Sequence, residues 1–226
     1  MAGEKGRIGL IVPANNAAIE YDFWNMVPKG VTIHSTRMPS VKGDEPISDI
    51  EIANFKKELS NAVKLLSQVS NVIVYGRTYG SRTHPEIIKN VYDNIIIPEY
   101  EAAKSLHKLN AKNIFVLTPY NKWRTKGTLS FFKSEGFNIV GYDFMNRIRG
   151  IDIANIDTDT IIKFLNRNLG IIKNSDAVYI ASTALSTSDY INEIAKYVKI
   201  PVITENISAI NETLKKLRVP FVLHLL

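Results

Sequence analysis

The feature that most constrains this 226-residue chain is an internal repeat with a spacing of nearly half its length. The segment Ile8-Gly-Leu-Ile-Val-Pro-Ala-Asn resembles Ile114-Phe-Val-Leu-Thr-Pro-Tyr-Asn, and Gly30-Val-Thr-Ile returns at the same interval as Gly136-Phe-Asn-Ile. A third stretch, 70–78, aligns with 175–183 at an interval one residue shorter. Three matches in the same order indicate a duplicated unit. We therefore expect two similar halves, 1–110 and 111–226.

Short apolar, β-branched runs alternate with longer segments of helical periodicity, a pattern typical of parallel sheets covered by helices. The predicted strands are Arg7–Val12, Val31–Met38, Val72–Tyr75, Asn113–Thr118, Asn138–Phe144, Ala177–Ala181 and Pro201–Thr204. The predicted helices are Ser48–Val69, Pro98–Leu109, Lys122–Glu135, Asp157–Ile172, Ser188–Val198 and Ile207–Leu217. Ser48 and Asp157 are favoured N-cap types, and Gly136 is a helix stop. The expected fold is α/β, with two pseudo-symmetric βαβ-type halves, each a mostly parallel sheet flanked by helices, and a cleft between them.

Composition excludes several classes of site. The chain has no cysteine, so disulfides, thiolate metal sites and cysteine nucleophiles are absent. The four histidines lack metal-ligand spacing, and no dinucleotide or phosphate-loop motif occurs, so no metal or cofactor is expected. His34, in a strand, and His84, in a strand-end loop, are the histidines considered as general bases.

Charge and hydropathy bear on partners and location. The net charge of +6 comes from scattered basic residues rather than a clustered patch, so we expect no nucleic-acid partner. No apolar run reaches the ~18 residues that cross a bilayer, and the first residues lack the apolar core of a secretory signal. The expectation is a cytoplasmic protein without a membrane partner.

Polar loops follow the predicted strands in both halves. They read Pro13-Ala-Asn-Asn, Gly76-Arg-Thr-Tyr-Gly-Ser, Thr118-Pro-Tyr-Asn, Ser182-Thr-Ala-Leu-Ser-Thr and Thr204-Glu-Asn. Ligands of open α/β sheets bind beyond the carboxyl ends of strands, where loops and helix N-termini expose N–H groups. Hydroxyls, amides and small residues suit a carboxylate site there, although the same residues also form ordinary turns. Their presence at matching ends of both halves favours the carboxylate site.

At these loops the chain resembles a known superfamily. The motifs are Pro13, Asn16 and Glu20 after the first strand, His34-Ser-Thr-Arg-Met in the second, and Thr118-Pro-Tyr120 at mid-chain. They resemble the aspartate/glutamate racemase superfamily, in its branch of maleate cis-trans isomerases and arylmalonate decarboxylases, and the similarity spans nearly the whole chain. The resemblance implies a small carboxylate ligand, two pseudo-symmetric halves, no metal or organic cofactor, and a homo-oligomer.

The family's two cysteines are replaced in this chain. The resemblance places them in the third-strand loop of each half, on opposite faces of the substrate, where Arg77 and Ser182 stand here. An arginine, with a pKa of ~12.5 or above, does not release its proton in a protein, so the two-thiol racemase mechanism is excluded. Serine is a weak nucleophile unless a nearby base takes its proton.

Arg77 and Ser182 are the predicted catalytic residues. The planar fork of Arg77 suits a carboxylate ligand, and the alternative is a structural ion pair with Glu20 or Glu205. Ser182 is a nucleophile, an oxyanion donor together with Thr183, or a helix N-cap. The donor role needs no unusual pKa, and we favour it.

The remaining predicted substrate-binding residues supply hydroxyls and amides. Thr78 and Ser81 belong to the Arg77 loop, where hydroxyls and backbone amides surround an anion or simply cap a turn. Asn16 and Asn206 both donate and accept, which suits orienting a carboxylate, although both are also capping residues. Tyr120 is the aromatic candidate for a donor into the cleft, or else a half-buried tyrosine at a strand end.

Two functions follow from these residues. The first is a cofactor-independent isomerase, decarboxylase or lyase acting on a small mono- or dicarboxylic acid through an enediolate- or carbanion-like intermediate, with chemistry altered by the loss of both cysteines. The second is a non-catalytic carboxylate-binding protein or sensor, which the same loss suggests. The retained polar loops favour the enzyme.

Overall fold

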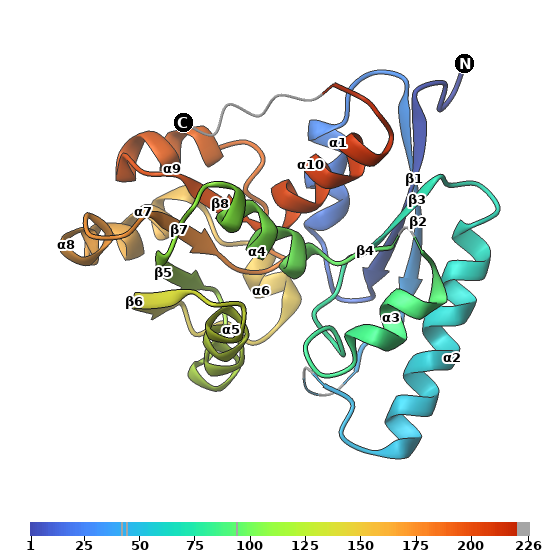
Figure 1. Cartoon of the computed structure of the whole chain (residues 1–226), viewed down its shortest axis with the longest axis horizontal. Coiled ribbons are helices and arrows are strands. Elements are labelled where there is room, and N and C mark those ends of the chain that lie inside the picture. Colours follow the sequence, from blue (N-terminus) through green and yellow to red (C-terminus); the bar gives the residue numbers. More distant parts are fainter. Residues whose placement is uncertain (42, 44, 94, 221–226) are drawn as a thin grey trace.

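The repeated segments form two four-stranded parallel sheets with the same strand order (Figure 1). The computed structural model describes residues 1–41, 43, 45–93 and 95–220. The first sheet has the order β2-β1-β3-β4, formed by β1 (Gly6–Pro13), β2 (Val31–Met38), β3 (Val72–Tyr75) and β4 (Ile95–Ile96). The second has the order β6-β5-β7-β8, formed by β5 (Asn113–Thr118), β6 (Asn138–Phe144), β7 (Ala177–Ile180) and β8 (Val202–Thr204). The predicted α/β fold of two similar halves is confirmed.

Helices cover both sheets. In chain order they are α1 (Ile19–Met26), α2 (Asp49–Leu66), α3 (Pro85–Val91), α4 (Pro98–Lys108), α5 (Lys122–Ser134), α6 (Gly150–Ala154), α7 (Thr158–Asn166), α8 (Leu169–Ile172), α9 (Ile191–Val198) and α10 (Glu205–Lys216). The two predicted N-caps are confirmed, because Ser48 accepts the Glu51 N–H and Asp157 accepts the Thr160 N–H. Gly136 directly follows the C-cap of α5 and has a φ of +92°, a conformation that glycine adopts without strain.

The sequence prediction differs from the structure at short elements. The predicted helix 157–172 is broken into α7 and α8, where the Asn168 side chain bonds the Phe164 carbonyl and Asp143. The prediction missed α1, α3, α6 and β4, which are too short to show clear periodicity and depend on tertiary packing. Helix α9 begins three residues later than predicted, and α10 begins two residues earlier, because Thr204 caps it and brings Glu205 into its first turn.

The last helix of each half packs into the core of the other half. Ala102, Ala103 and Leu106 of α4 belong to the apolar core around the second sheet. Ala209, Ile210 and Leu214 of α10 belong to the core on one face of the first sheet, together with Ile8, Leu10 and Val12. Figure 1 shows α4 and α10 in the middle of the molecule, between the sheets. This exchange of helices joins the two sheets through shared apolar cores. The predicted division into halves 1–110 and 111–226 stays a prediction.

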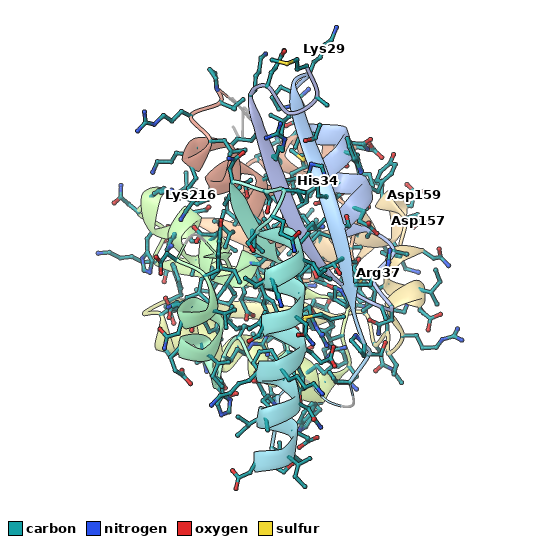
Figure 2. All side chains as sticks on the ribbon, turned by 90° about the vertical axis from the view of Figure 1, so that its right-hand side faces the viewer. Lys29, His34, Arg37, Asp157, Asp159 and Lys216 are labelled. Atoms are coloured by element: carbon teal, nitrogen blue, oxygen red, sulfur yellow. The ribbon has the colours of Figure 1, made fainter. Side chains whose placement is uncertain are left out.

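Strand β2 is an edge strand of the first sheet. Figure 2 labels His34 and Arg37 on this strand. The half-buried His34 ring lies 3.1 Å from the Thr32 hydroxyl, and Arg37 forms an ion pair with Glu20. Among the helices that the structure describes, none has the length and apolarity needed to span a membrane.

Candidate functional site

A cavity of about 410 Å³ lies where the carboxyl ends of the two sheets meet. Its volume is within the range of small-molecule sites in proteins. The first half contributes Pro13, Asn15, Asn16, Ser40, Val41, Gly43, Arg77, Thr78 and Tyr79. The second half contributes Tyr120, Asn121, Trp123, Arg124, Ile148, Gly150, Ile153, Ser182, Thr183 and Ala184. None of the described lining residues is a carboxylate, so the charged groups in the wall are cations.

The two third-strand loops contact each other directly. The Thr183 hydroxyl donates to the Gly76 carbonyl at 3.1 Å and accepts from the Asn16 amide, also at 3.1 Å. Position 76 requires glycine, because the backbone there lies so close to β1 that a Cβ would be 2.7 Å from the Ile11 carbonyl oxygen. The fold therefore brings the Arg77 and Ser182 loops to one cavity from opposite halves.

Arg77 is a buried cation in the cavity wall. It is only 5% exposed, and its guanidinium lies 5.6 Å from the centre of the Tyr79 ring. Among the described residues, the guanidinium has no hydrogen-bond or ion-pair partner, and the one hydrogen bond donated by Arg77 runs from its backbone N–H to the Tyr75 carbonyl. The alternative of a structural pair with Glu20 or Glu205 is not what the structure has, because Glu20 pairs with Arg37 and Glu205 accepts from other donors. A buried charge without a protein partner favours an oppositely charged ligand.

Ser182 has a strained backbone. Its φ of +99° is a conformation that residues with a side chain rarely adopt, and such strain concentrates at functional sites. The Ser182 N–H donates to Glu205 Oε1 at 2.8 Å, while its hydroxyl oxygen accepts the Ala184 N–H at 3.1 Å. The alternative of an N-cap role does not hold, because this hydroxyl closes a local turn and α9 starts only at Ile191. The backbone N–H is occupied, so the hydroxyl, which also hydrogen-bonds the Tyr120 hydroxyl, is the group that Ser182 offers to the cavity.

Glu205 lies behind the Ser182 loop, at the first position of α10. It is 1% exposed, and its Oε1 also accepts the Tyr179 hydroxyl at 2.8 Å. Its Oε2 is buried and has no hydrogen-bond partner among the described residues. Burial and the neighbouring Glu99 raise the pKa of Glu205 to about 7, against the hydrogen bonds from Ser182 and Tyr179. Sequence analysis considered Glu205 only as an ion-pair partner of Arg77, because nothing in the sequence shows that it is buried.

Tyr120 and Arg124 form the wall of the second half. Tyr120 is buried, and that burial, with the nearby Glu205 carboxylate, raises the pKa of its hydroxyl above the ordinary range, so it stays a neutral donor. The Arg124 guanidinium lies 4.5 Å from the centre of the Tyr120 ring. Sequence analysis missed Arg124, although its place in the first turn of a helix that follows a strand-end loop was a usable signal.

The other predicted site residues divide into two groups. Asn16 and Thr78 line the cavity, and Asn16 also caps α1 by accepting the N–H groups of residues 18 and 19. Ser81 and Asn206 do not line it. The Ser81 hydroxyl donates to the Thr78 carbonyl, and the Asn206 amide donates to Asp22 and to the Thr183 carbonyl, so both support the loops from behind.

Comparison with known proteins shows which chains share this fold. No family model matches the chain. Maleate isomerase of Pseudomonas putida is 26% identical over 236 residues, which cover 93% of this chain and 91% of that protein. Nocardia farcinica maleate cis-trans isomerase aligns with a TM-score of 0.78 and 18% identity, covering 95% of this chain and 94% of that chain. The resemblance to the maleate isomerase and arylmalonate decarboxylase branch is confirmed.

Two further solved structures share the fold. A Pseudomonas putida maleate isomerase with maleate aligns with a TM-score of 0.76 at 21% identity, covering 95% of this chain and 93% of that chain. An arylmalonate decarboxylase in a sulfate-associated form aligns with a TM-score of 0.77 at 14% identity, covering 94% of this chain and 93% of that chain. The Nocardia structure contains a covalently bound succinylcysteine intermediate. That adduct cannot form in this chain, because it has no cysteine.

Proposed function

We propose that this chain is a cofactor-independent enzyme that acts on a small mono- or dicarboxylic acid by a reaction that uses no thiol. The observation that carries the proposal is Arg77, a buried guanidinium in a polar cavity without an ion-pair partner among the described residues. The supporting observation is the similarity to maleate isomerase along 93% of the chain.

In this proposal Arg77 binds one carboxylate of the substrate. A guanidinium presents parallel N–H groups that match the two oxygens of a carboxylate, and the charge strengthens both hydrogen bonds. Thr78 lies beside it, and Asn16 holds the facing Thr183 hydroxyl in place.

The opposite wall stabilises the charge that develops in the reaction. When the C–CO₂⁻ bond of a malonate-type acid breaks heterolytically, CO₂ leaves and the electron pair passes into the remaining carboxyl group as an enediolate, whose carbon then takes a proton from water. The Ser182 and Tyr120 hydroxyls are donors fixed in advance by the fold, and such preorganised donors lower the barrier. The resemblance assigns Ser182 to the position of a family thiol, and on that ground we assign it to the reacting centre.

Turnover assays with maleate and arylmalonates test the proposal. We expect product formation that Ser182→Ala reduces by ~100-fold or more, the scale seen when one oxyanion donor is removed. Arg149→Ala is the control, since Arg149 is exposed and pairs with Asp152. Failure of the wild-type protein to bind or convert any acid of a broad panel would refute the proposal.

The absence of cysteine supports a second candidate, a non-catalytic carboxylate-binding protein or sensor. It predicts that malonate or maleate raises the melting temperature without being converted. Product formation by the wild-type protein would exclude it. The expected homo-oligomer likewise stays a proposal, which light scattering of the purified protein tests.

A further inference from the structure

Glu205 supports the Ser182 loop from the interior. Its Oε1 accepts the Ser182 backbone N–H and the Tyr179 hydroxyl, each at 2.8 Å. Its Oε2 is buried and, in the part of the chain that the structure describes, has no hydrogen-bond partner. A buried carboxylate with an unsatisfied oxygen is unfavourable, so its presence at this place calls for a reason beyond packing.

One reason lies in the Ser182 backbone. A strained φ persists only where the surroundings hold it. Here the Ser182 N–H is turned inward to Glu205, and the Asn206 amide holds the next carbonyl, that of Thr183, at 3.2 Å. With its N–H directed at the interior, Ser182 lines the cavity with its hydroxyl group. Glu205 and Asn206, two consecutive residues of α10, therefore fix the orientation of this turn toward the cavity.

The charges around Glu205 indicate a second effect. Glu99 on α4 and Arg82 in the loop after β3 form a buried ion pair at 2.7 Å, and their charges offset each other. The remaining titratable neighbours are Tyr179 on β7 and Tyr120 after β5, both of which burial keeps neutral. An ionised Glu205 therefore places a net negative charge behind a cavity suited to anions, and a protonated Glu205 removes it.

We propose that Glu205 is a positioning residue of this site: its carboxyl group fixes the turn that presents the Ser182 hydroxyl, and it takes up a proton when an anionic ligand binds. The second part rests on the proposed function, whereas the first concerns the loop itself. Burial already raises the pKa of this carboxyl group toward neutrality, and a nearby anion raises it further. Anion affinity should therefore increase as pH falls through neutrality.

The test uses Glu205→Gln and Glu205→Ala, with Glu101→Gln as a matched control, because Glu101 is a buried helix glutamate that pairs with Lys104 away from the cavity. Hydrogen exchange of the Ser182 amide, without ligand, reports the turn. Calorimetric binding of malonate and maleate from about pH 5 to pH 9, in buffers of different ionisation enthalpy, reports the proton.

We expect the wild-type affinity for these acids to fall by up to ~10-fold per pH unit above neutrality, with net proton uptake. Glu205→Gln, which keeps the acceptor but cannot ionise, should bind with no such pH dependence. Glu205→Ala should exchange the Ser182 amide faster and bind at least ~10-fold more weakly. Glu101→Gln should match the wild type in both measurements.

Two results would overturn the proposal. One is a Glu205→Gln protein with the wild-type pH dependence, and the other is a Glu205→Ala protein with unchanged Ser182 exchange. If the wild type binds neither acid, the proposed function fails while amide exchange still decides the positioning role. If Glu205→Ala does not fold, the pH profile of Glu205→Gln decides.

Discussion

Arg77 and Arg82 provide the sharpest test of the site, because one loop carries both buried arginines in opposite electrostatic situations. Arg82 forms a fork-like pair with Glu99 and also donates to Thr128. The Arg77 guanidinium has no hydrogen bond or ion pair with the described residues and lies 5.6 Å from the centre of the Tyr79 ring. Replacing each by methionine keeps an apolar stem of similar length and removes the charge. The two substitutions should therefore have opposite effects on stability.

The magnitudes follow from what each guanidinium loses. Breaking a buried ion pair costs about 3–5 kcal/mol, so Arg82→Met should lower the free energy of unfolding by that amount. Removing an unpaired buried cation relieves a desolvation cost of several kcal/mol. Arg77 lines an open cavity and gains about 0.5–2 kcal/mol from the Tyr79 ring, so the relief is partial. We expect Arg77→Met to leave the ligand-free protein about 1 kcal/mol more stable.

Ligand binding should change in the opposite direction at Arg77. Hydrogen bonds to charged groups contribute about 1.5–3 kcal/mol, so Arg77→Met should weaken malonate or maleate binding by ~10- to 100-fold. Urea denaturation without ligand measures the stability, and calorimetry at fixed salt measures the affinity. A loss of stability in Arg77→Met comparable to that of Arg82→Met would show that Arg77 is structural. Unchanged affinity would refute its role in carboxylate binding.

Further predictions concern the same loops. Ser182→Gly should relieve the backbone strain and stabilise the ligand-free protein by about 1 kcal/mol while lowering turnover, as thermal unfolding and product assays will show; destabilisation would contradict it. Gly76→Ala should destabilise by about 1–3 kcal/mol, because its Cβ would meet the Ile11 carbonyl, and a urea midpoint equal to the wild type would refute this close contact. Burial raises the folded-state pKa values of both Glu205 and Asp22, so the folded state binds more protons than the unfolded chain. The free energy of unfolding should therefore fall as pH rises. For Glu205 this decrease spans the window from about pH 4.5 to about pH 7. Denaturation across that window should show a shallower slope in Glu205→Gln, and an identical slope would exclude Glu205 as its source.

Local patterns account for most of what sequence analysis predicted. Strands β2, β3, β5 and β6 begin and end at the predicted residues, because apolar and β-branched residues recur within short segments that turn residues separate. The repeat placed Arg77 and Ser182 at equivalent loops, and the structure has both in the wall of one cavity. Asn16, Thr78, Tyr120 and Thr183 lie in that wall as well.

Short elements and buried partners were not predictable in this way. Helix α1 depends on capping by Asn16 and on packing against the first sheet, neither of which has a periodic signal. Ser81 and Asn206 are polar residues in the expected loops, but their side chains bond neighbouring loop atoms instead of facing the cavity. The identity of a residue does not specify on which side of a loop its side chain lies.

The sequence by itself determined the α/β class, the duplication, the absence of thiol chemistry and the loops that carry polar groups. These properties reside in residue type and in spacing along the chain. Only the tertiary structure decided that Arg77 has no ion-pair partner among the described residues, that Glu205 lies behind Ser182, and that α4 and α10 exchange between the cores. Burial and pairing depend on which segments distant in the sequence meet in space, and they set the charge and the pKa on which the proposed chemistry depends.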